Sequence, residues 1–195
     1  MKTKILLGTI AIILGLATGI YFFRPHTFHG TVIQSPETSY DFTLTGGNGD
    51  VSLSDFRGKL VLIYFGYTFC PDICPATLGN VNQALKQIGS KAEDIQLIMV
   101  SLDPQRDTPE KLEQYVAHFN PTFIGITGTQ EQVDTVTSLY GIFYEKKEGS
   151  EATSYLIDHT ATLMVIDREG YLKLVFPFGV TADEIADDLK YMLRQ

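Results

Sequence analysis

The fold is decided by residues 60–75, which read LVLIYFGYTFCPDICP. The first six of these residues are continuously apolar, which is typical of a central strand buried on both faces. Residues 77–88 follow with apolar side chains at helical spacing. A strand that leads into a cysteine motif at the start of a helix predicts a functional site at the open edge of an α/β sheet.

Both cysteines of the chain, Cys70 and Cys74, lie in this stretch. Each precedes a proline, and a following proline disfavours helical geometry. Pro75 suits the first position of a helix, so the sequence predicts Cys74 near the N-cap. The helix dipole and free amide groups would stabilise a thiolate there. Three intervening residues, bent by Pro71, allow the two sulfurs to converge on one point.

Strands and helices alternate on both sides of the cysteine motif. The predicted strands cover residues 41–45, 51–53, 60–65, 95–102, 123–126, 162–166 and 171–176, with at most a short strand at 31–33. The predicted helices cover residues 77–88, 131–139 and 182–193, and another begins with Thr108 as N-cap and Pro109 at the first helical position. This order predicts an α/β, thioredoxin-like fold: a central mixed sheet flanked by helices, with an N-terminal hairpin.

The composition is that of a folded, acidic protein. The chain has 195 residues, of which 44% are hydrophobic and 19% charged, which excludes a disordered or fibrous protein. Apart from Lys2 and Lys4, it carries 13 basic residues against 23 acidic ones. Nucleic acid is therefore a poor partner, and a cation or a positively charged protein surface is a better one.

Residues 5–23 form an uncharged run of 19 residues. As a helix the run would be roughly 28 Å long, close to the hydrocarbon thickness of ~30 Å. It is longer than the apolar part of a cleaved signal peptide, so a retained transmembrane anchor is favoured over cleavage. The preceding lysines predict a single-pass protein of the cell membrane, with a cytoplasmic N-terminus and an extracytoplasmic domain. The expected division is an anchor at 1–23, a linker at 24–40 and one domain at 41–195.

The cysteine pair leaves several kinds of chemistry open. A buried apolar role or a structural disulfide is disfavoured by the flanking prolines and the short loop. Thiol-disulfide reductases of this fold place two residues between their cysteines, and the three residues found here weaken that interpretation. A metal held by two thiolates needs a further ligand; soft sulfur selects Cu(I), and an added imidazole also suits Cu(II).

Four histidines are candidates for the further ligand. His26 and His29 fall in the predicted linker, and His118 is expected on a helix surface. His159 differs because it comes shortly before the strand predicted at 162–166. In thioredoxin folds the loop before this strand faces the cysteine loop and normally holds a cis-proline, but Ala161 stands in its place. A histidine two residues upstream of the missing proline favours metal binding over general disulfide exchange.

Three separated motifs resemble the Sco/SenC family of copper proteins, which is known for assembling the dinuclear copper centre of cytochrome c oxidase. The motifs are residues 64–75, 103–109 and 155–160, and the match extends over about residues 40–195. A single N-terminal span is also typical of that family. One departure is Phe69, where relatives often carry histidine.

The resemblance implies a membrane-anchored copper chaperone, not an enzyme. It implies copper ligands at Cys70, Cys74 and His159, a redox disulfide between the two cysteines, and delivery to the copper-bearing subunit of a haem-copper oxidase. The alternative is a thiol-disulfide oxidoreductase that reduces the cysteines of that subunit. A peroxidase of related fold, or a redox or copper sensor with a membrane partner, also stays open.

The residues Asp103, Arg106 and Asp107 match the acidic turn of the family. By themselves they are expected to shape a turn and to cap the helix that follows. A supporting contact to the metal ligands, or a contact to a partner, is the alternative.

Overall fold

The computed structural model describes residues 26–150 and 153–195. The predicted anchor at residues 1–23 lies outside this part of the chain. None of the helices within the described ranges is long and apolar enough to cross a membrane.

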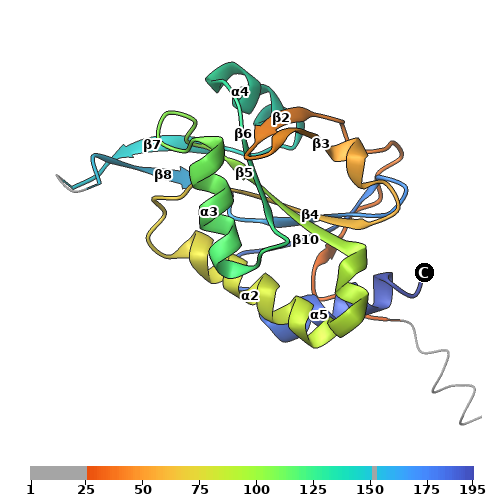
Figure 1. The fold of residues 1–195 in the computed structure, drawn as a ribbon. Coiled ribbons are helices and arrows are strands. Elements are labelled where there is room, and N and C mark those ends of the chain that lie inside the picture. Colours follow the sequence, from red (N-terminus) through yellow and green to blue (C-terminus); the bar gives the residue numbers. More distant parts are fainter. Residues whose placement is uncertain (1–25, 151–152) are drawn as a thin grey trace, which may run out of the picture.

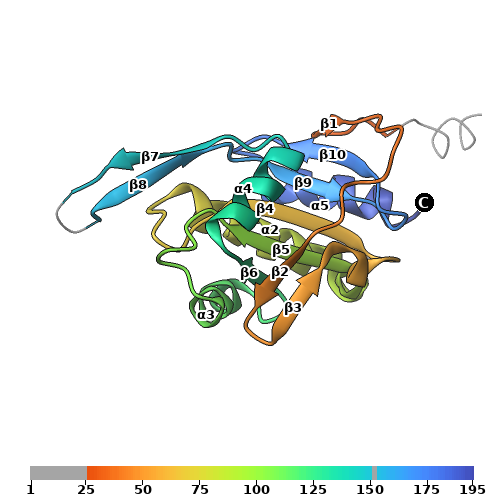
Figure 2. The same ribbon diagram turned by 90° about the horizontal axis from the view of Figure 1, so that it is seen from above.

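A mixed sheet of eight strands forms the centre of the described part of the chain (Figures 1 and 2). The strands are β1 (Thr31–Val32), β2 (Thr43–Gly46), β3 (Gly49–Ser52), β4 (Leu60–Gly66), β5 (Ile95–Ser101), β6 (Ile124–Thr127), β9 (Leu163–Ile166) and β10 (Leu172–Phe176). Their order is β1-β10-β9-β4-β5-β6-β2-β3. The central strands β4, β5 and β6 are parallel, and the strands on both sides of them pair antiparallel. The expected mixed sheet with an N-terminal hairpin is thus confirmed.

Helices cover both faces of this sheet. They are α2 (Ile73–Ile88), α3 (Pro109–Phe119), α4 (Gln130–Leu139) and α5 (Ala182–Met192), with short 3-10 turns η1 (Leu53–Phe56) and η2 (Gly89–Asp94). Helices α2, α3 and α5 lie on one face and α4 on the other (Figures 1 and 2). Because β4, β5 and β6 follow one another across the sheet, right-handed crossovers keep α2 and α3 on the same face.

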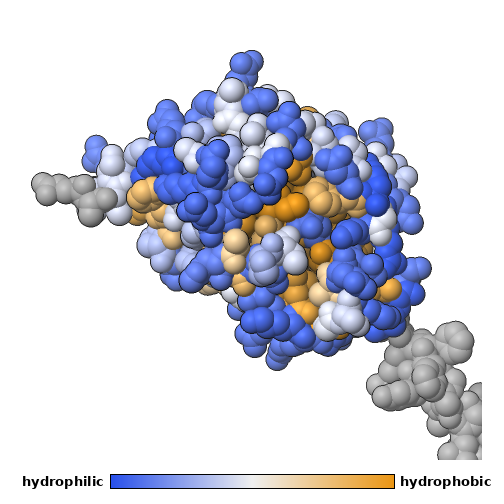
Figure 3. All heavy atoms as spheres, in the orientation of Figure 1, coloured by the Kyte–Doolittle hydropathy of each residue, from blue (hydrophilic) through white to orange (hydrophobic). Residues whose placement is uncertain are grey.

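The core lies along the two central strands. Every residue of β4 and β5 is buried, as their continuous apolar runs predict. Burial of one leucine, isoleucine or valine side chain contributes about 1.5 to 3 kcal/mol, so these strands are a main source of stability. The view in Figure 3 shows hydrophilic side chains over most of the surface, with hydrophobic ones gathered toward the middle of that face.

Helix α2 begins four residues before the predicted start. Its first residue is Ile73 and its N-cap is Asp72, so Cys74 lies inside the first turn and not at the N-cap. Pro75 is tolerated in this turn because the first amide groups of a helix have no partner within the helix. The start of α3 agrees with the sequence, since the Thr108 side chain accepts a hydrogen bond from the Lys111 amide.

A separate hairpin extends from the main sheet as an arm (Figure 2). It consists of β7 (Tyr144–Glu148) and β8 (Tyr155–His159), which within residues 26–150 and 153–195 pair with each other and with no further strand. The sequence pattern does not predict these strands. The charged sequence of β7 is compatible with a strand because four of its five residues are exposed. His159 therefore ends a strand and does not lie in a loop.

The described part of the predicted linker packs against α5. The buried Asp188 carboxylate binds the His26 imidazole at 2.8 Å and accepts hydrogen bonds from the backbone amides of His29 and Gly30 at 2.9 and 3.0 Å. The His26 ring also stacks on Tyr191, with ring centres 4.3 Å apart. These contacts give His26 and His29 a structural role in attaching the linker to α5.

Candidate metal centre

The candidate site lies at one edge of the main sheet. Pairing places Tyr64 of β4 opposite Leu163 of β9 and Gly66 of β4 opposite Ser101 of β5. Strands β4 and β5 are parallel and β9 is antiparallel to β4. The segments after β4, after β5 and before β9 therefore leave the sheet at the same edge, and the three sequence motifs meet there.

Three potential metal-ligating atoms converge at this edge. The sulfurs of Cys70 and Cys74 and a ring nitrogen of His159 lie within 4.8 Å of one another. Cys74 Sγ lies 3.8 Å from His159 Nε2. Cys74 is buried, whereas Cys70 and His159 are partly exposed. The group is therefore accessible from the side on which Cys70 and His159 lie.

The two cysteines differ in their protonation. The neighbouring Cys74 thiol, the His159 side chain and the Cys74 backbone amide at 3.3 Å together lower the pKa of Cys70 to about 4, against the opposing effect of burial. The nearby Cys70 sulfur and burial raise the pKa of Cys74 far above its usual range. At neutral pH the pair therefore holds one thiolate and one thiol.

The orientation of the His159 ring suits metal binding. Its Nδ1 lies 3.2 Å from the carbonyl oxygen of Thr160. A carbonyl only accepts hydrogen bonds, so Nδ1 carries the hydrogen in the neutral ring. Nε2 is then left with a free lone pair on the side of Cys74, which is the usual arrangement of a metal-ligating histidine.

Close packing surrounds the buried sulfur. The rings of Tyr64 and Tyr67 lie edge-on to His159, with ring centres 6.3 and 6.1 Å apart. Burial raises the pKa of both tyrosines, so their hydroxyls stay neutral beside the cysteines. At Gly66 there is no room for a side chain, because a Cβ atom would lie 2.9 Å from Cys74 Sγ.

Asp107 has a different role from the one expected. Its buried carboxylate accepts hydrogen bonds from the Thr68 amide at 2.9 Å, the Thr68 hydroxyl at 2.5 Å and the Ser101 hydroxyl at 2.7 Å. The helix cap is provided by Thr108 alone. Asp107 therefore fastens the cysteine loop to the end of β5.

The model of the SCO1/SenC family matches residues 31–194. The chain belongs to the SCO1/SenC family. A SCO2-like protein from Rickettsia felis is 38% identical over 152 residues, which are 77% of this chain and 74% of the relative. Membership of the family, which three motifs indicated, is thus confirmed.

Solved structures of other SCO1/SenC proteins share the fold. Apo Sco1 from Thermus thermophilus has a TM-score of 0.77 and 40% identity, covering 86% of this chain and 98% of that one. ScoI from Arabidopsis thaliana, solved with copper bound, has a TM-score of 0.76 and 30% identity, covering 82% of this chain and 99% of that one. The fold is also that of the thioredoxin domain of a Bacteroides vulgatus thiol-disulfide oxidoreductase, with a TM-score of 0.60 and 18% identity. The match covers 83% of this chain and 99% of that one, so the fold is thioredoxin-like.

The site of this SCO1/SenC protein includes residues that sequence reasoning missed. Tyr67 reaches across to β8, where its hydroxyl oxygen accepts a hydrogen bond from the Ile157 amide at 3.1 Å. Tyr155 donates a hydrogen bond to Asp103 from the same strand. No local sequence pattern marks these contacts, because their partners are 90 and 52 residues apart.

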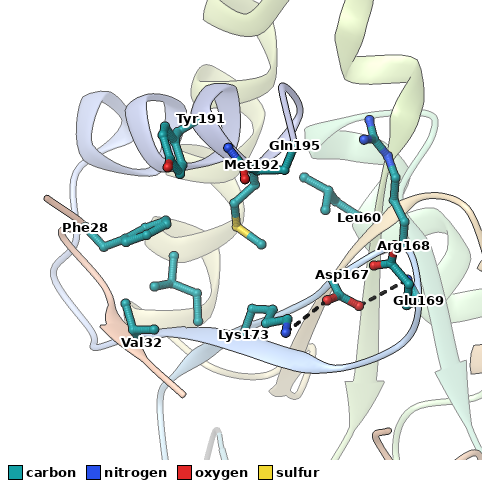
Figure 4. A pocket seen from close by; sticks show the side chains of 11 residues that line it. Phe28, Val32, Leu60, Asp167, Arg168, Glu169, Lys173, Tyr191, Met192 and Gln195 are labelled. Carbon is teal, nitrogen blue, oxygen red and sulfur yellow. Dashed lines mark hydrogen bonds and ion pairs between the residues drawn. The ribbon is translucent and has the colours of Figure 1, made fainter. Parts of the chain in front are cut away.

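A cavity of about 420 Å³ lies away from the candidate site, at the opposite end of β4 (Figure 4). It is lined by Phe28, Leu60 and Tyr191, among others, and Lys173 and Asp167 form an ion pair in its wall at 3.5 Å. None of the three candidate ligands lines it. This cavity is therefore separate from the candidate site.

Proposed function

We propose that this SCO1/SenC protein is a copper chaperone that binds copper through Cys70, Cys74 and His159. The observation that carries the proposal is the convergence of two sulfurs and one imidazole nitrogen within 4.8 Å. Two thiolates and an imidazole form a soft donor set that selects Cu(I) and also accommodates Cu(II). The copper-bound Arabidopsis relative, which shares 30% identity, supports copper as the metal.

The protonation of the cysteines suggests how copper is loaded. Cys70 is a thiolate and partly exposed, so it is the first sulfur available to an arriving ion. Cys74 must lose its proton as copper binds, because a thiolate is the metal-binding form. Since Cys74 is buried, ligands of a recipient approach from the side of Cys70 and His159, and copper leaves by stepwise ligand exchange.

The proposed recipient is the copper-bearing subunit of a haem-copper oxidase, as the family resemblance implies. Residues 1–23 would anchor the protein in the cell membrane and place the domain on the extracytoplasmic side. The uncharged run of 19 residues and the preceding lysines support this topology. The strongly acidic composition of the remainder is compatible with handling a cation.

Thiol-disulfide exchange is the second candidate function, and one observation favours it. A partly exposed thiolate, Cys70, followed by a buried thiol, Cys74, is the arrangement of an attacking and a resolving cysteine. Such an enzyme would reduce the cysteines of the same oxidase subunit. This reaction has no need of the third donor, His159.

Copper titration of the reduced full-length protein tests the proposal. The double change Cys70→Ser, Cys74→Ser and the single change His159→Ala are both expected to weaken binding, whereas His118→Ala, an exposed histidine on α3, is the matched control. Unchanged affinity in either site variant would show that the site is wrong. Absorption spectra add a signature, since a Cu(II) thiolate has an intense charge-transfer band and a disulfide protein has none.

The same variants separate the two functions. Rapid disulfide exchange with an oxidase-subunit peptide that survives His159→Ala, in a protein that retains no copper, would favour the oxidoreductase. Copper binding that is lost with His159→Ala while disulfide exchange is slow supports the chaperone.

A further inference from the structure

The position of His159 depends on how the arm is held. His159 is the last residue of β8, and in the described residues β8 pairs only with β7 and not with the main sheet. The ladder of the main sheet holds the chain only from Leu163 onward. Side-chain contacts between the arm and the rest of the domain hold the strand that carries the imidazole.

Arg106 makes several of these contacts. It lies in the turn after β5, and its Nη1 donates hydrogen bonds to the backbone carbonyls of Thr153 at 2.9 Å and Tyr155 at 3.2 Å. Its guanidinium carbon also lies 3.6 Å from the centre of the Tyr155 ring. One arginine side chain thus holds both the backbone and a side chain at the start of β8.

The same guanidinium contacts the cysteine loop. Its carbon lies 4.5 Å from the centre of the ring of Phe69, the residue before Cys70. In such a cation–π contact the positive guanidinium is attracted to the negative face of the ring. Arg106 therefore joins the segment that carries Cys70 to the strand that carries His159.

Two fully buried carboxylates fix the turn on which Arg106 lies. Asp103 pairs with Arg106 Nε and accepts a hydrogen bond from the Tyr155 hydroxyl at 2.5 Å. Asp107 holds Thr68 of the cysteine loop. Both carboxylates have 0% exposure, so these charge-assisted bonds form in a low-dielectric environment, where they are strong.

We propose that Arg106 is a positioning residue for the candidate metal site. It clamps β8 to the cysteine loop and so keeps the His159 imidazole within reach of the two sulfurs, without itself touching the metal. The inference rests on the proposed function, because it assigns Arg106 a part in copper binding by that site. The planar guanidinium of Arg106 donates hydrogen bonds to two carbonyls and a carboxylate at the same time, which a lysine could not do.

A double-mutant cycle tests the proposal. Cu(I) affinity of the reduced full-length protein is measured by competition with a chromophoric chelator for the unchanged protein, Arg106→Gln, His159→Ala and the double variant. Arg106→Gln is expected to weaken binding roughly 10-fold when His159 is present. In the His159→Ala background the additional loss is expected to stay within about twofold, because Arg106 acts through the imidazole.

If Arg106→Gln lowers the Cu(I) affinity equally with and without His159, or lowers it in neither case, the proposal is overturned. Arg168→Gln is the matched control, since the Arg168 side chain forms a single 4.0 Å ion pair, with the exposed Asp94, in the part of the chain that the structure describes. If Arg106→Gln does not fold, Tyr155→Phe takes its place in the cycle. Tyr155→Phe keeps the ring under the guanidinium and removes the hydrogen bond to Asp103. A smaller loss of Cu(I) affinity is therefore expected, and only when His159 is present.

Amide hydrogen exchange of the copper-free protein separates this inference from the proposed function. Arg106→Gln is expected to speed exchange at residues 155–159, while Arg168→Gln leaves it unchanged. Unaltered exchange in Arg106→Gln would refute the clamp even if copper binds as proposed. Absence of copper binding by the unchanged protein would refute the proposed function, and the exchange data would still decide whether Arg106 holds the arm.

Discussion

The backbone amide of Cys74 donates a hydrogen bond to the sulfur of Cys70 across 3.3 Å. The contact arises because α2 begins at Ile73, so the amide of Cys74 is one of the first-turn amides that have no partner inside the helix. Cys70 acts as an external acceptor for that amide, and the positive end of the helix favours a negative sulfur there. The early start of the helix thus makes the two cysteines chemically unequal.

Cys70 is expected to react as a thiolate well below neutral pH. Its pKa is lowered to about 4, chiefly by the Cys74 thiol, so its alkylation by iodoacetamide should change little between pH 8 and pH 6. An ordinary cysteine, with a pKa of about 8.5, slows about tenfold per pH unit in that range. Mass spectrometry of the modified protein gives the rate at each pH.

The variant Cys74→Ala provides the comparison for this experiment. Removing the neighbouring thiol raises the pKa of Cys70, so the alkylation rate of the variant is expected to fall between pH 8 and pH 6. Identical pH profiles for the two proteins would contradict the described effect of the Cys74 thiol.

Copper binding is expected to release about one proton per ion at pH 7.5. Cys70 is already deprotonated, and the raised pKa of Cys74 means that this thiol must give up its proton on binding. Affinity therefore falls about tenfold for each pH unit of acidification near neutrality. Calorimetry in buffers of different ionisation enthalpy counts the protons; nearly two, the value for two ordinary thiols, would show that Cys70 is not a thiolate.

Gly66→Ala is expected to destabilise the fold and to weaken copper binding. The new Cβ would lie 2.9 Å from both Cys74 Sγ and Tyr64 Cε1, inside the packed end of β4. Overpacking of this kind costs about 1 to 3 kcal/mol of unfolding free energy, measurable by urea denaturation. Gly79→Ala is the control, because nothing lies within 4 Å of its Cβ, and in the middle of α2 it should stabilise by up to about 1 kcal/mol. A destabilising Gly79→Ala, or a harmless Gly66→Ala, would argue against the described packing.

Asp188→Ala is expected to lower stability without altering copper affinity. The change leaves two backbone amides and the His26 ring without their buried acceptor, at a cost of roughly 2 to 4 kcal/mol. Asp187→Ala, an exposed neighbour on α5, should cost less than about 1 kcal/mol. Urea denaturation and copper titration of both variants provide the measurement. Reduced copper affinity in folded Asp188→Ala would mean that this end of α5 is coupled to the metal site.

Much of the fold could be predicted because its signals are local. The uninterrupted apolar residues of β4 and β5 identify the centre of the sheet, and Thr108 followed by Pro109 marks the start of α3. Strand order brings the segment of His159 to the sheet edge where Cys70 and Cys74 lie, since β9 follows His159 and runs antiparallel beside β4. Their role as copper ligands stays a prediction.

The features of the fold and the site that have no local signal depend on contacts between residues far apart in the sequence. The arm has no strand signal in the sequence because β7 carries charges at most of its positions and packs few apolar side chains. The position of Asp107 predicts a part in a helix cap, yet its carboxylate binds Thr68, which is 39 residues away. A single sequence carries no local pattern for such pairings.

With the proposed anchor in place, the attachment of residues 26–30 to α5 would orient the domain relative to the membrane. Phe28 shares the cavity at one end of β4 with Leu60, while Cys70 and Cys74 follow the other end, about 20 Å further along the strand. With residues 1–23 in the bilayer, as proposed, the short attached segment would hold the Leu60 end closest to the lipid. The donor atoms would then stand raised above the membrane surface, so a membrane-bound recipient must present its own site at a comparable height to meet them.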